Sequence, residues 1–261
     1  DLHLCDRRQR QMCIRDSPNH AGDQMNGYIL KPTNFDPSKR YPVVMSQYSG
    51  PGSQSVLDKW TIDWEYYLVS KGFIVACVDG RGTGGRSRAY ETSVYMQLGK
   101  LETEDQVAGA EYMRTLPYVD GKHIGIYGWS YGGYETLMAM STSNGTYQAG
   151  VAIAPVTDWR YYDTIYAERF MRTPNENNEG YEQSAPITHA EKLKGDLLII
   201  SGTADDNVHY LNTLQYSAAL IEAGIQFDTQ IYTNKDHHIR GCNTRHHLYT
   251  KVCNFFLDKL K

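Results

Sequence analysis

The sequence lacks the features that would place it in several specialised classes of protein. No stretch approaches the roughly 18 consecutive apolar residues that a helix needs to cross a bilayer, and the hydrophobic fraction is 41%. A basic surplus is missing too, because 26 Lys and Arg face 30 Asp and Glu, for a net charge of -4. This balance argues against nucleic acid as the main partner. The function must therefore be inferred from individual motifs.

Cysteine is also sparse and carries no metal-binding pattern. The five cysteines, at positions 5, 13, 77, 242 and 253, show neither CxxC nor metal-ligand spacing, and an odd number cannot pair completely within one chain. The adjacent His246 and His247 lack an HExxH context, so they are interpreted as surface or helix histidines. We expect no metal and no cofactor.

Residues 1–17 are predicted to be non-native. The run Met12-Cys13-Ile14-Arg15-Asp16-Ser17 is one translation of a transposon end used in sequencing libraries. If so, the natural protein extends further upstream, and the missing signal peptide carries no information.

The rest of the chain, 18–261, has the length of one α/β domain. From about residue 26, short apolar β-rich runs alternate with helical stretches, which predicts a mostly parallel sheet with helices on both faces. The predicted strands are 27–30, 42–47, 73–78, 124–127, 151–154, 197–201 and 229–232. The predicted helices are 62–71, 103–114, 134–141, 211–223 and 246–260.

One motif predicts a nucleophilic serine. Gly128-Trp129-Ser130-Tyr131-Gly132-Gly133 lies between the predicted strand 124–127 and a helix. In the α/β-hydrolase fold, a G-x-S-x-G turn between strand and helix is a tight elbow that exposes the serine hydroxyl. The N–H of Tyr131 is then placed to donate to an oxyanion. A glycine-rich turn capped by a serine is the alternative interpretation.

An acid and a base are expected later in the chain, in the order Ser, Asp or Glu, His. Asp205 and Asp206 follow the predicted strand 197–201, and His237 and His238 follow the strand 229–232. Functional residues gather at the carboxyl ends of parallel strands. The residues alone leave Asp205 and Asp206 as alternatives for the acid. His237 is the predicted base, with His238 as its competitor.

These motifs resemble the dipeptidyl peptidase IV branch of the prolyl oligopeptidase family of serine peptidases. The resemblance rests on GWSYGG at 128–133, GTADDNVH at 202–209 and the DH pair at 236–237, and it extends from about residue 26 to the end. It selects Asp205 over Asp206 as the acid and implies that Tyr48 is a second oxyanion donor. The alternative interpretation is that the Tyr48 ring only packs against its neighbours and has no catalytic role.

The same resemblance implies a substrate site. Val156, Trp159, Tyr162 and Tyr166, closed by Tyr131 and Val208, are expected to form a pocket for proline, with ordinary core packing as the alternative for the tyrosines. Asn207 is expected to bind a substrate carbonyl, and Arg169 to lie at the rim of the site. The area and shape of such a pocket favour proline and then alanine. A charged side chain is disfavoured because it would lose its hydration there without gaining a partner.

The resemblance further implies cleavage after a penultimate proline of a peptide, releasing N-terminal dipeptides in a full-length protein that carries an upstream β-propeller. The propeller of such relatives holds the substrate's amino terminus. A homodimer and a periplasmic or extracellular location are also expected. The alternatives are a related hydrolase, such as an acylaminoacyl peptidase or an esterase, and a catalytically inactive binding or assembly module.

Overall fold

The computed structural model describes residues 12–59 and 63–261. Within them, eight strands form one sheet in the order β1-β2-β4-β3-β5-β6-β7-β8. Strands β3 to β8 are parallel to one another, whereas β1 and β2 are antiparallel to their neighbours. The strands are β1 (Met12–Pro18), β2 (Gln24–Leu30), β3 (Tyr41–Ser46), β4 (Ile74–Asp79), β5 (Val119–Trp129), β6 (Ala149–Ile153), β7 (Asp196–Gly202) and β8 (Asp228–Tyr232).

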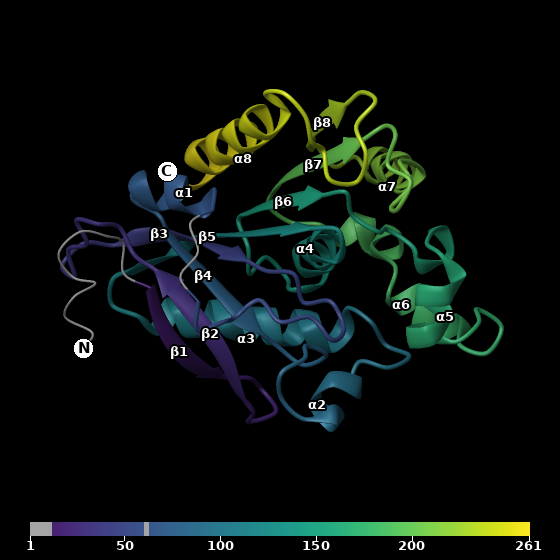
Figure 1. Cartoon of the computed structure of the whole chain (residues 1–261), viewed down its shortest axis with the longest axis horizontal. Coiled ribbons are helices and arrows are strands. Elements are labelled where there is room, and N and C mark those ends of the chain that lie inside the picture. Colours follow the sequence, from purple (N-terminus) through teal and green to yellow (C-terminus); the bar gives the residue numbers. More distant parts are fainter. Residues whose placement is uncertain (1–11, 60–62) are drawn as a thin grey trace.

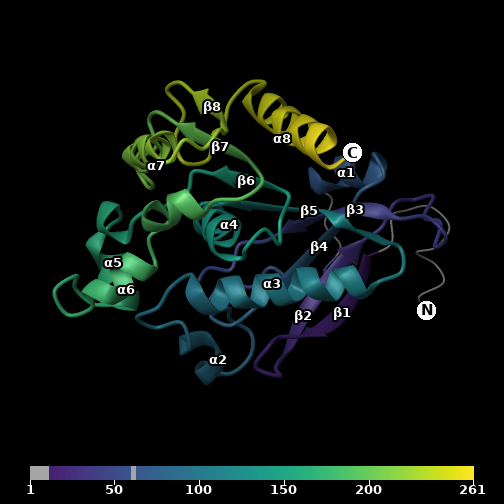
Figure 2. The same cartoon turned by 180° about the vertical axis from the view of Figure 1, so that it is seen from behind.

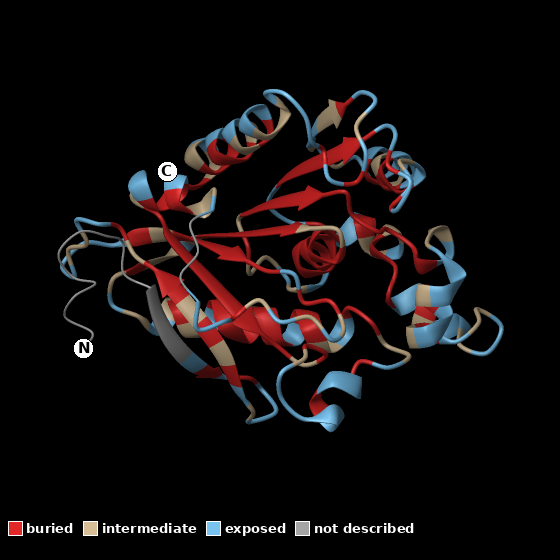
Figure 3. Ribbon diagram, viewed as in Figure 1, coloured by how far each residue is buried: buried red, intermediate tan, exposed pale blue. Residues whose placement is uncertain are grey.

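Helices cover both faces of the sheet. Helices α1 (Glu65–Ser70) and α8 (Thr244–Leu260) pack on one face, and α3 (Lys100–Thr115), α4 (Tyr131–Thr142) and α7 (Leu211–Glu222) lie on the other (Figures 1 and 2). Two apolar clusters fill the two interfaces, and the central strands are buried along their length (Figure 3). This two-sided burial explains why β4 and β7 are continuous apolar runs. The mostly parallel α/β fold predicted from the sequence is confirmed.

A third apolar cluster lies beyond the carboxyl ends of the strands. The short helices α2 (Arg88–Thr92), α5 (Thr164–Met171) and α6 (Asn178–Gln183) stand at this end, outside the sheet (Figure 1). In the chain order, β3 is followed by β4 on one side and by β5 on its other side. The sheet therefore has a topological switch point next to β3, which is where open α/β sheets usually bind ligands.

Several element boundaries differ from the prediction. Helix α4 begins at Tyr131 rather than at 134, since Tyr134 N–H already donates to Ser130 O at 2.9 Å. Gly132 and Gly133 weaken the helix signal, although close packing requires them. Strand β5 begins at Val119, and α3 begins at Lys100 after Gly99, whose φ is 79°. Helices α2, α5 and α6 were not predicted, because they are too short for a periodic apolar pattern.

Part of the amino-terminal predictions falls outside the described residues. Residues 1–11 of the segment predicted to be non-native lie outside the described residues, as does residue 62, where the first helix was predicted to begin. Residues Met12–Pro18 form β1, which pairs antiparallel with β2. This pairing does not test whether the segment is native. Among the described residues, no helix is both long enough and apolar enough to span a membrane.

A buried acid lies between α3 and α4. The Glu135 side chain is fully buried, and Thr103 Oγ1 donates to its Oε1 at 2.8 Å. Burial raises the pKa of Glu135 well above its usual value of 4.5, and the nearby Glu102 charge acts in the same direction. The folded protein therefore holds a proton that the unfolded chain releases at lower pH.

The sign of the pH effect follows from this raised pKa. The stabilising contribution is complete below the unfolded pKa and is lost as the pH rises through the folded pKa. The free energy of unfolding of the wild type should fall between about pH 5 and about pH 8. In Glu135→Gln we expect this fall to be smaller by about 1 kcal/mol, because glutamine does not titrate. Urea titrations at both pH values measure this difference. The exposed Glu104→Gln is the control, and an identical fall in Glu135→Gln would contradict the expectation.

Candidate active site

Ser130 occupies a strained turn between β5 and α4. Its φ is 61° and its ψ is -117°, a conformation that is uncommon for a residue with a side chain. The Ser130 N–H donates to Ile153 O of β6 at 2.8 Å, and the helix begins at the next residue. The turn therefore places the hydroxyl at the carboxyl end of β5, beside the amino-terminal end of α4.

Two glycines allow the neighbouring backbone to approach this turn. A Cβ atom on Gly128 would lie 2.1 Å from Gly132 O, and one on Gly132 would lie 2.5 Å from Gln47 O. Both distances are impossible for real side chains, so the turn needs glycine at both positions. The Gln47 side chain also donates from Nε2 to Gly132 O at 2.8 Å, which joins the end of β3 to the first turn of α4.

Asp205 and His237 form a buried pair at the ends of β7 and β8. His237 Nδ1 lies 2.8 Å from Asp205 Oδ2. The other carboxylate oxygen, Oδ1, accepts the N–H groups of Asn207 and Val208 at 3.0 and 2.9 Å. This arrangement fixes the carboxylate, leaves Nε2 of the imidazole facing away from it and selects one orientation of the ring.

The two alternative residues in these loops differ from Asp205 and His237 in their exposure to solvent. Asp206 and His238 are both exposed, whereas Asp205 and His237 are only 6% and 8% exposed. Trp129 Nε1 donates to His237 O at 3.0 Å, so the residue before the serine anchors the histidine loop. Among the described contacts, Ser130 and His237 share no hydrogen bond. Hydrogen bonds between a nucleophile and its base are often loose until substrate binds.

Tyr48 follows β3, the neighbour of β5, and its phenol reaches Ser130. The hydrogen bond with the Ser130 side chain lowers the pKa of Tyr48, but burial outweighs it and the pKa is raised overall. The phenol is therefore neutral at ordinary pH and can donate a proton in a hydrogen bond. The loop after Tyr48 is fixed because Asp79 Oδ2 accepts the N–H groups of Ser55 and Val56 at 3.1 and 2.8 Å.

A small aromatic pocket opens beside Ser130. Trp159 and Tyr166 stack with ring centroids 5.7 Å apart, and Tyr162 meets Tyr166 edge-on at 5.4 Å. Asp163 positions the last two rings, because its side chain caps α5 by accepting the Tyr166 N–H at 2.8 Å. The pocket is lined by Tyr48, Ser130, Tyr131, Val156, Trp159, Tyr162 and Tyr166.

The remaining predicted site residues lie further from the serine. Val208 is 3% exposed and packs in the cluster behind the pocket rather than in its lining. Asn207 Oδ1 accepts the Tyr162 hydroxyl at 2.7 Å. Arg169 is exposed on α5 and is not part of the pocket lining. His247 Nδ1 pairs with the Tyr232 hydroxyl at 2.8 Å, so at least one of the adjacent histidines has a packing role.

One residue of the site was missed in the sequence. Glu102 is fully buried, and its Oε1 accepts the hydroxyl of Tyr131 at 2.7 Å. The sequence offered one indication of Glu102, its place as the third residue of a helix that begins after Gly99. Glutamate is common at this position because its side chain can accept a backbone N–H at the start of the helix.

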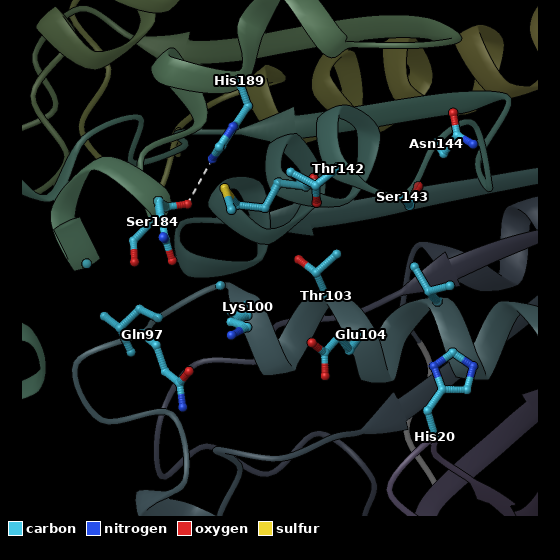
Figure 4. A pocket seen from close by; sticks show the side chains of 16 residues that line it. His20, Gln97, Lys100, Thr103, Glu104, Thr142, Ser143, Asn144, Ser184 and His189 are labelled. Atoms are coloured by element: carbon cyan, nitrogen blue, oxygen red, sulfur yellow. Dashed lines mark hydrogen bonds between the residues drawn. The ribbon is translucent and has the colours of Figure 1, made fainter.

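A larger cavity of about 530 Å³ lies between α3, α4 and the segment that follows α6 (Figure 4). Lys100, Thr103 and Glu104 of α3 face it from one side, with Thr142 and His189 opposite (Figure 4). None of Ser130, Asp205 and His237 lines this cavity. In the described part of the chain, no group of three His, Cys, Asp or Glu residues could hold a metal ion.

The strand order and the serine elbow define an α/β-hydrolase fold, with Ser130, Asp205 and His237 in the chain order of that fold. The sequence model of the prolyl oligopeptidase family matches residues 60–261. The chain belongs to this family, which confirms the resemblance noted in the sequence.

Individual relatives agree with this assignment. The chain is 43% identical over 240 residues to a protein of Grosmannia clavigera named probable dipeptidyl-aminopeptidase B, covering 90% of this chain and 24% of that protein. It is 41% identical over 231 residues to dipeptidyl peptidase 4 of Sus scrofa, covering 87% of this chain and 30% of that protein. The chain thus spans 24% and 30% of the length of these two curated relatives.

A solved structure is similar as well. The crystal structure of Porphyromonas gingivalis dipeptidyl peptidase 4 superposes with a TM-score of 0.95 at 53% identity, covering 97% of this chain and 36% of that chain.

The two neighbouring aspartates offer a matched test of the site. In Asp205→Asn we expect labelling of Ser130 by a fluorophosphonate to slow by about 10³-fold to 10⁴-fold, because an amide that donates to Nδ1 leaves the imidazole proton on Nε2, which then cannot accept the serine proton. In Asp206→Asn the rate should stay within about twofold, since that carboxylate is exposed. The measurement is the labelling time course of both folded variants. Equal rates in the two variants would remove Asp205 from the site.

Proposed function

We propose that this chain is the catalytic domain of a serine peptidase that cleaves after proline, and less readily after alanine. One observation carries the proposal: the strained Ser130 turn, the buried Asp205–His237 pair and an aromatic pocket meet at one end of the sheet. A serine, an oriented imidazole and oxyanion donors suffice for acyl transfer, so the reaction requires no metal or cofactor.

In the proposed reaction, Ser130 Oγ attacks the carbonyl carbon of the scissile peptide bond while His237 takes the hydroxyl proton. The developing oxyanion accepts hydrogen bonds from the Tyr131 N–H and the Tyr48 hydroxyl. The C–N bond breaks as His237 returns the proton to the leaving amine, and an acyl-serine ester remains. Water then attacks this ester while His237 takes its proton, and the acyl C–O bond breaks as His237 returns that proton to Ser130 Oγ, which releases the carboxylic acid.

The pocket provides the proposed selectivity. Faces of Trp159, Tyr162 and Tyr166 offer a flat apolar surface beside the serine, which suits a pyrrolidine ring. Val208 supports this pocket from behind. Because Asn207 Oδ1 accepts from Tyr162, its amide nitrogen faces away from that ring and can donate to a substrate carbonyl. We assign Arg169 to the rim, where it can approach the part of the peptide that leaves the pocket.

For the full-length protein we propose release of N-terminal dipeptides, and a periplasmic or extracellular location. Dipeptide release is supported by the names of the relatives, dipeptidyl-aminopeptidase B and dipeptidyl peptidase 4. The proposed location rests on the family resemblance. We also propose that an upstream β-propeller completes the substrate site and holds the amino terminus.

The function is tested by hydrolysis of Gly-Pro, Ala-Ala and Gly-Lys chromogenic amides, together with fluorophosphonate labelling, in the wild type and in Ser130→Ala. We expect hydrolysis in the order proline, alanine, lysine, and loss of both hydrolysis and labelling in the variant. Labelling together with hydrolysis of simple esters but of none of the three amides indicates an esterase and contradicts the proposal. A folded wild-type chain that is not labelled contradicts catalysis by Ser130.

We further propose that the chain forms a homodimer. Helix α7 exposes Leu211, Leu214 and Ile221, with 45%, 49% and 68% of each residue accessible. Their spacing places them along one side of the helix, and exposed apolar stripes of this kind commonly mark contact surfaces.

Sedimentation velocity tests the dimer. Ile221→Glu should shift the protein toward the monomer, because the charge would be desolvated in an α7 contact. Ile165→Glu is the matched control, since Ile165 is 77% exposed on α5. A wild type that sediments as a monomer, or a dimer unaffected by Ile221→Glu, rules out this contact.

A further inference from the structure

A buried carboxylate lies directly behind the residue that follows the nucleophile. Tyr131 is the first residue of α4, and its ring is both 3% exposed and part of the pocket lining. Its hydroxyl donates to Glu102 Oε1 at 2.7 Å, and Glu102 itself is fully buried. This hydrogen bond joins the first turn of α3 to the first turn of α4.

The first turn of α3 is held against α4 by a second tyrosine. Tyr134, one helical turn after Tyr131, donates from its hydroxyl to Leu98 O at 2.9 Å. A Cβ atom on Gly99 would lie 2.2 Å from the same hydroxyl, so the close approach requires glycine there. Glu102 thus occupies a fixed position relative to α4. The amino-terminal end of α3 also favours a negative charge at this place.

Keeping an acid at this position is unfavourable for the fold. Burial raises the pKa of Glu102 to about 7, although the Tyr131 hydrogen bond and the N–H groups of Glu102 and Gly99 oppose the shift. Its second oxygen, Oε2, has no hydrogen-bond partner among the described residues. A titratable group that is buried beside a reactive serine and costs stability is a candidate for a functional role.

We propose that Glu102 is a positioning residue that acts through the Tyr131 hydroxyl. It fixes the aromatic ring that forms one wall of the pocket, and with it the backbone N–H that faces the serine hydroxyl. This inference rests on the proposed peptidase function, and it adds a determinant of proline selectivity outside the pocket lining. Tyr131 itself contacts the substrate, whereas Glu102 does not.

The physical reason is the geometry of the ring. Tyr131 meets Trp159 with ring centroids 5.5 Å apart and Tyr48 at 6.2 Å, so it lies between the pocket floor and the second oxyanion donor. Without a fixed hydroxyl, the ring can rotate about its side-chain bonds and change the width of the pocket. A rigid proline ring is sensitive to this width, and a small alanine side chain is much less so.

The test compares three variants at the contact with one control elsewhere. Tyr131→Phe removes the donor, Glu102→Leu removes the acceptor, and Glu102→Gln keeps an acceptor oxygen. Tyr147→Phe is the matched control, since Tyr147 is 1% exposed and its hydroxyl donates to Gln106 O of α3 at 2.7 Å. It removes a buried tyrosine hydroxyl that also donates to α3, from a residue outside the pocket lining.

We expect Tyr131→Phe and Glu102→Leu to lower kcat/KM for the Gly-Pro amide by about tenfold, the effect of one hydrogen bond to a charged group. The loss for the Ala-Ala amide should be about threefold or less, so that the proline preference falls. Glu102→Gln should restore most of the preference, and the double variant Glu102→Leu/Tyr131→Phe should be no worse than either single variant. Tyr147→Phe should lower stability without changing the preference.

The results separate this inference from the proposed function. If the wild type hydrolyses the Gly-Pro amide and Tyr131→Phe has the same proline preference, the proposed role of Glu102 is wrong. The peptidase proposal is then unaffected. If the wild type is labelled by fluorophosphonate but hydrolyses no amide, the proposal that this chain alone cleaves after proline fails. In that case the labelling rate decides: slower labelling of Tyr131→Phe than of Tyr147→Phe supports the positioning role, and equal rates overturn it. Tyr131→Phe also carries the test if Glu102→Leu does not fold.

Discussion

The close contact between the β5–α4 turn and its neighbours on both sides is the constraint on which the rest of the site depends. Ser130 can hold a φ of 61° because β6 accepts its N–H and because Gly128 and Gly132 leave room for the backbone. The same contact brings Gln47, and therefore Tyr48 after it, against the first turn of α4. Strain at Ser130 is thus offset by a set of contacts that also place Tyr48, the proposed second oxyanion donor.

The other half of the site is organised by loops rather than by a helix. Asp205 receives two backbone N–H groups and the imidazole, so that all its contacts point to a single orientation of the carboxylate. The histidine loop is tied to β5 through Trp129. The two halves are therefore connected by Trp129, immediately before Ser130, and the aromatic pocket is lined by residues that include Tyr166 of α5.

Much of this arrangement could be predicted from the sequence. Continuous apolar runs such as 197–201 predict buried parallel strands, and the polar residues at their carboxyl ends indicate which side chains meet. The sequence pattern could not decide between Asp205 and Asp206, because both lie in the same loop, and only the folded structure separates a buried Asp205 paired with His237 from an exposed Asp206. The start of α4 was predicted three residues late, since Gly132 and Gly133 are poor helix formers that are required by packing. Glu102 was missed because its partner Tyr131 lies in a different element, and no local pattern reports a contact between two helices.

The residues gathered around Ser130 come from five segments of the chain, which follow β3, β5, β6, β7 and β8. The aromatic rings of the pocket lie close together in the chain, but Ser130, Asp205 and His237 do not, so a chain that has paired only some of its strands has a serine but no partner for it. Ser130 should therefore become chemically reactive only when the whole parallel sheet has formed. During refolding, it should emerge together with the last parallel strand to dock, after most of the helix signal has already returned.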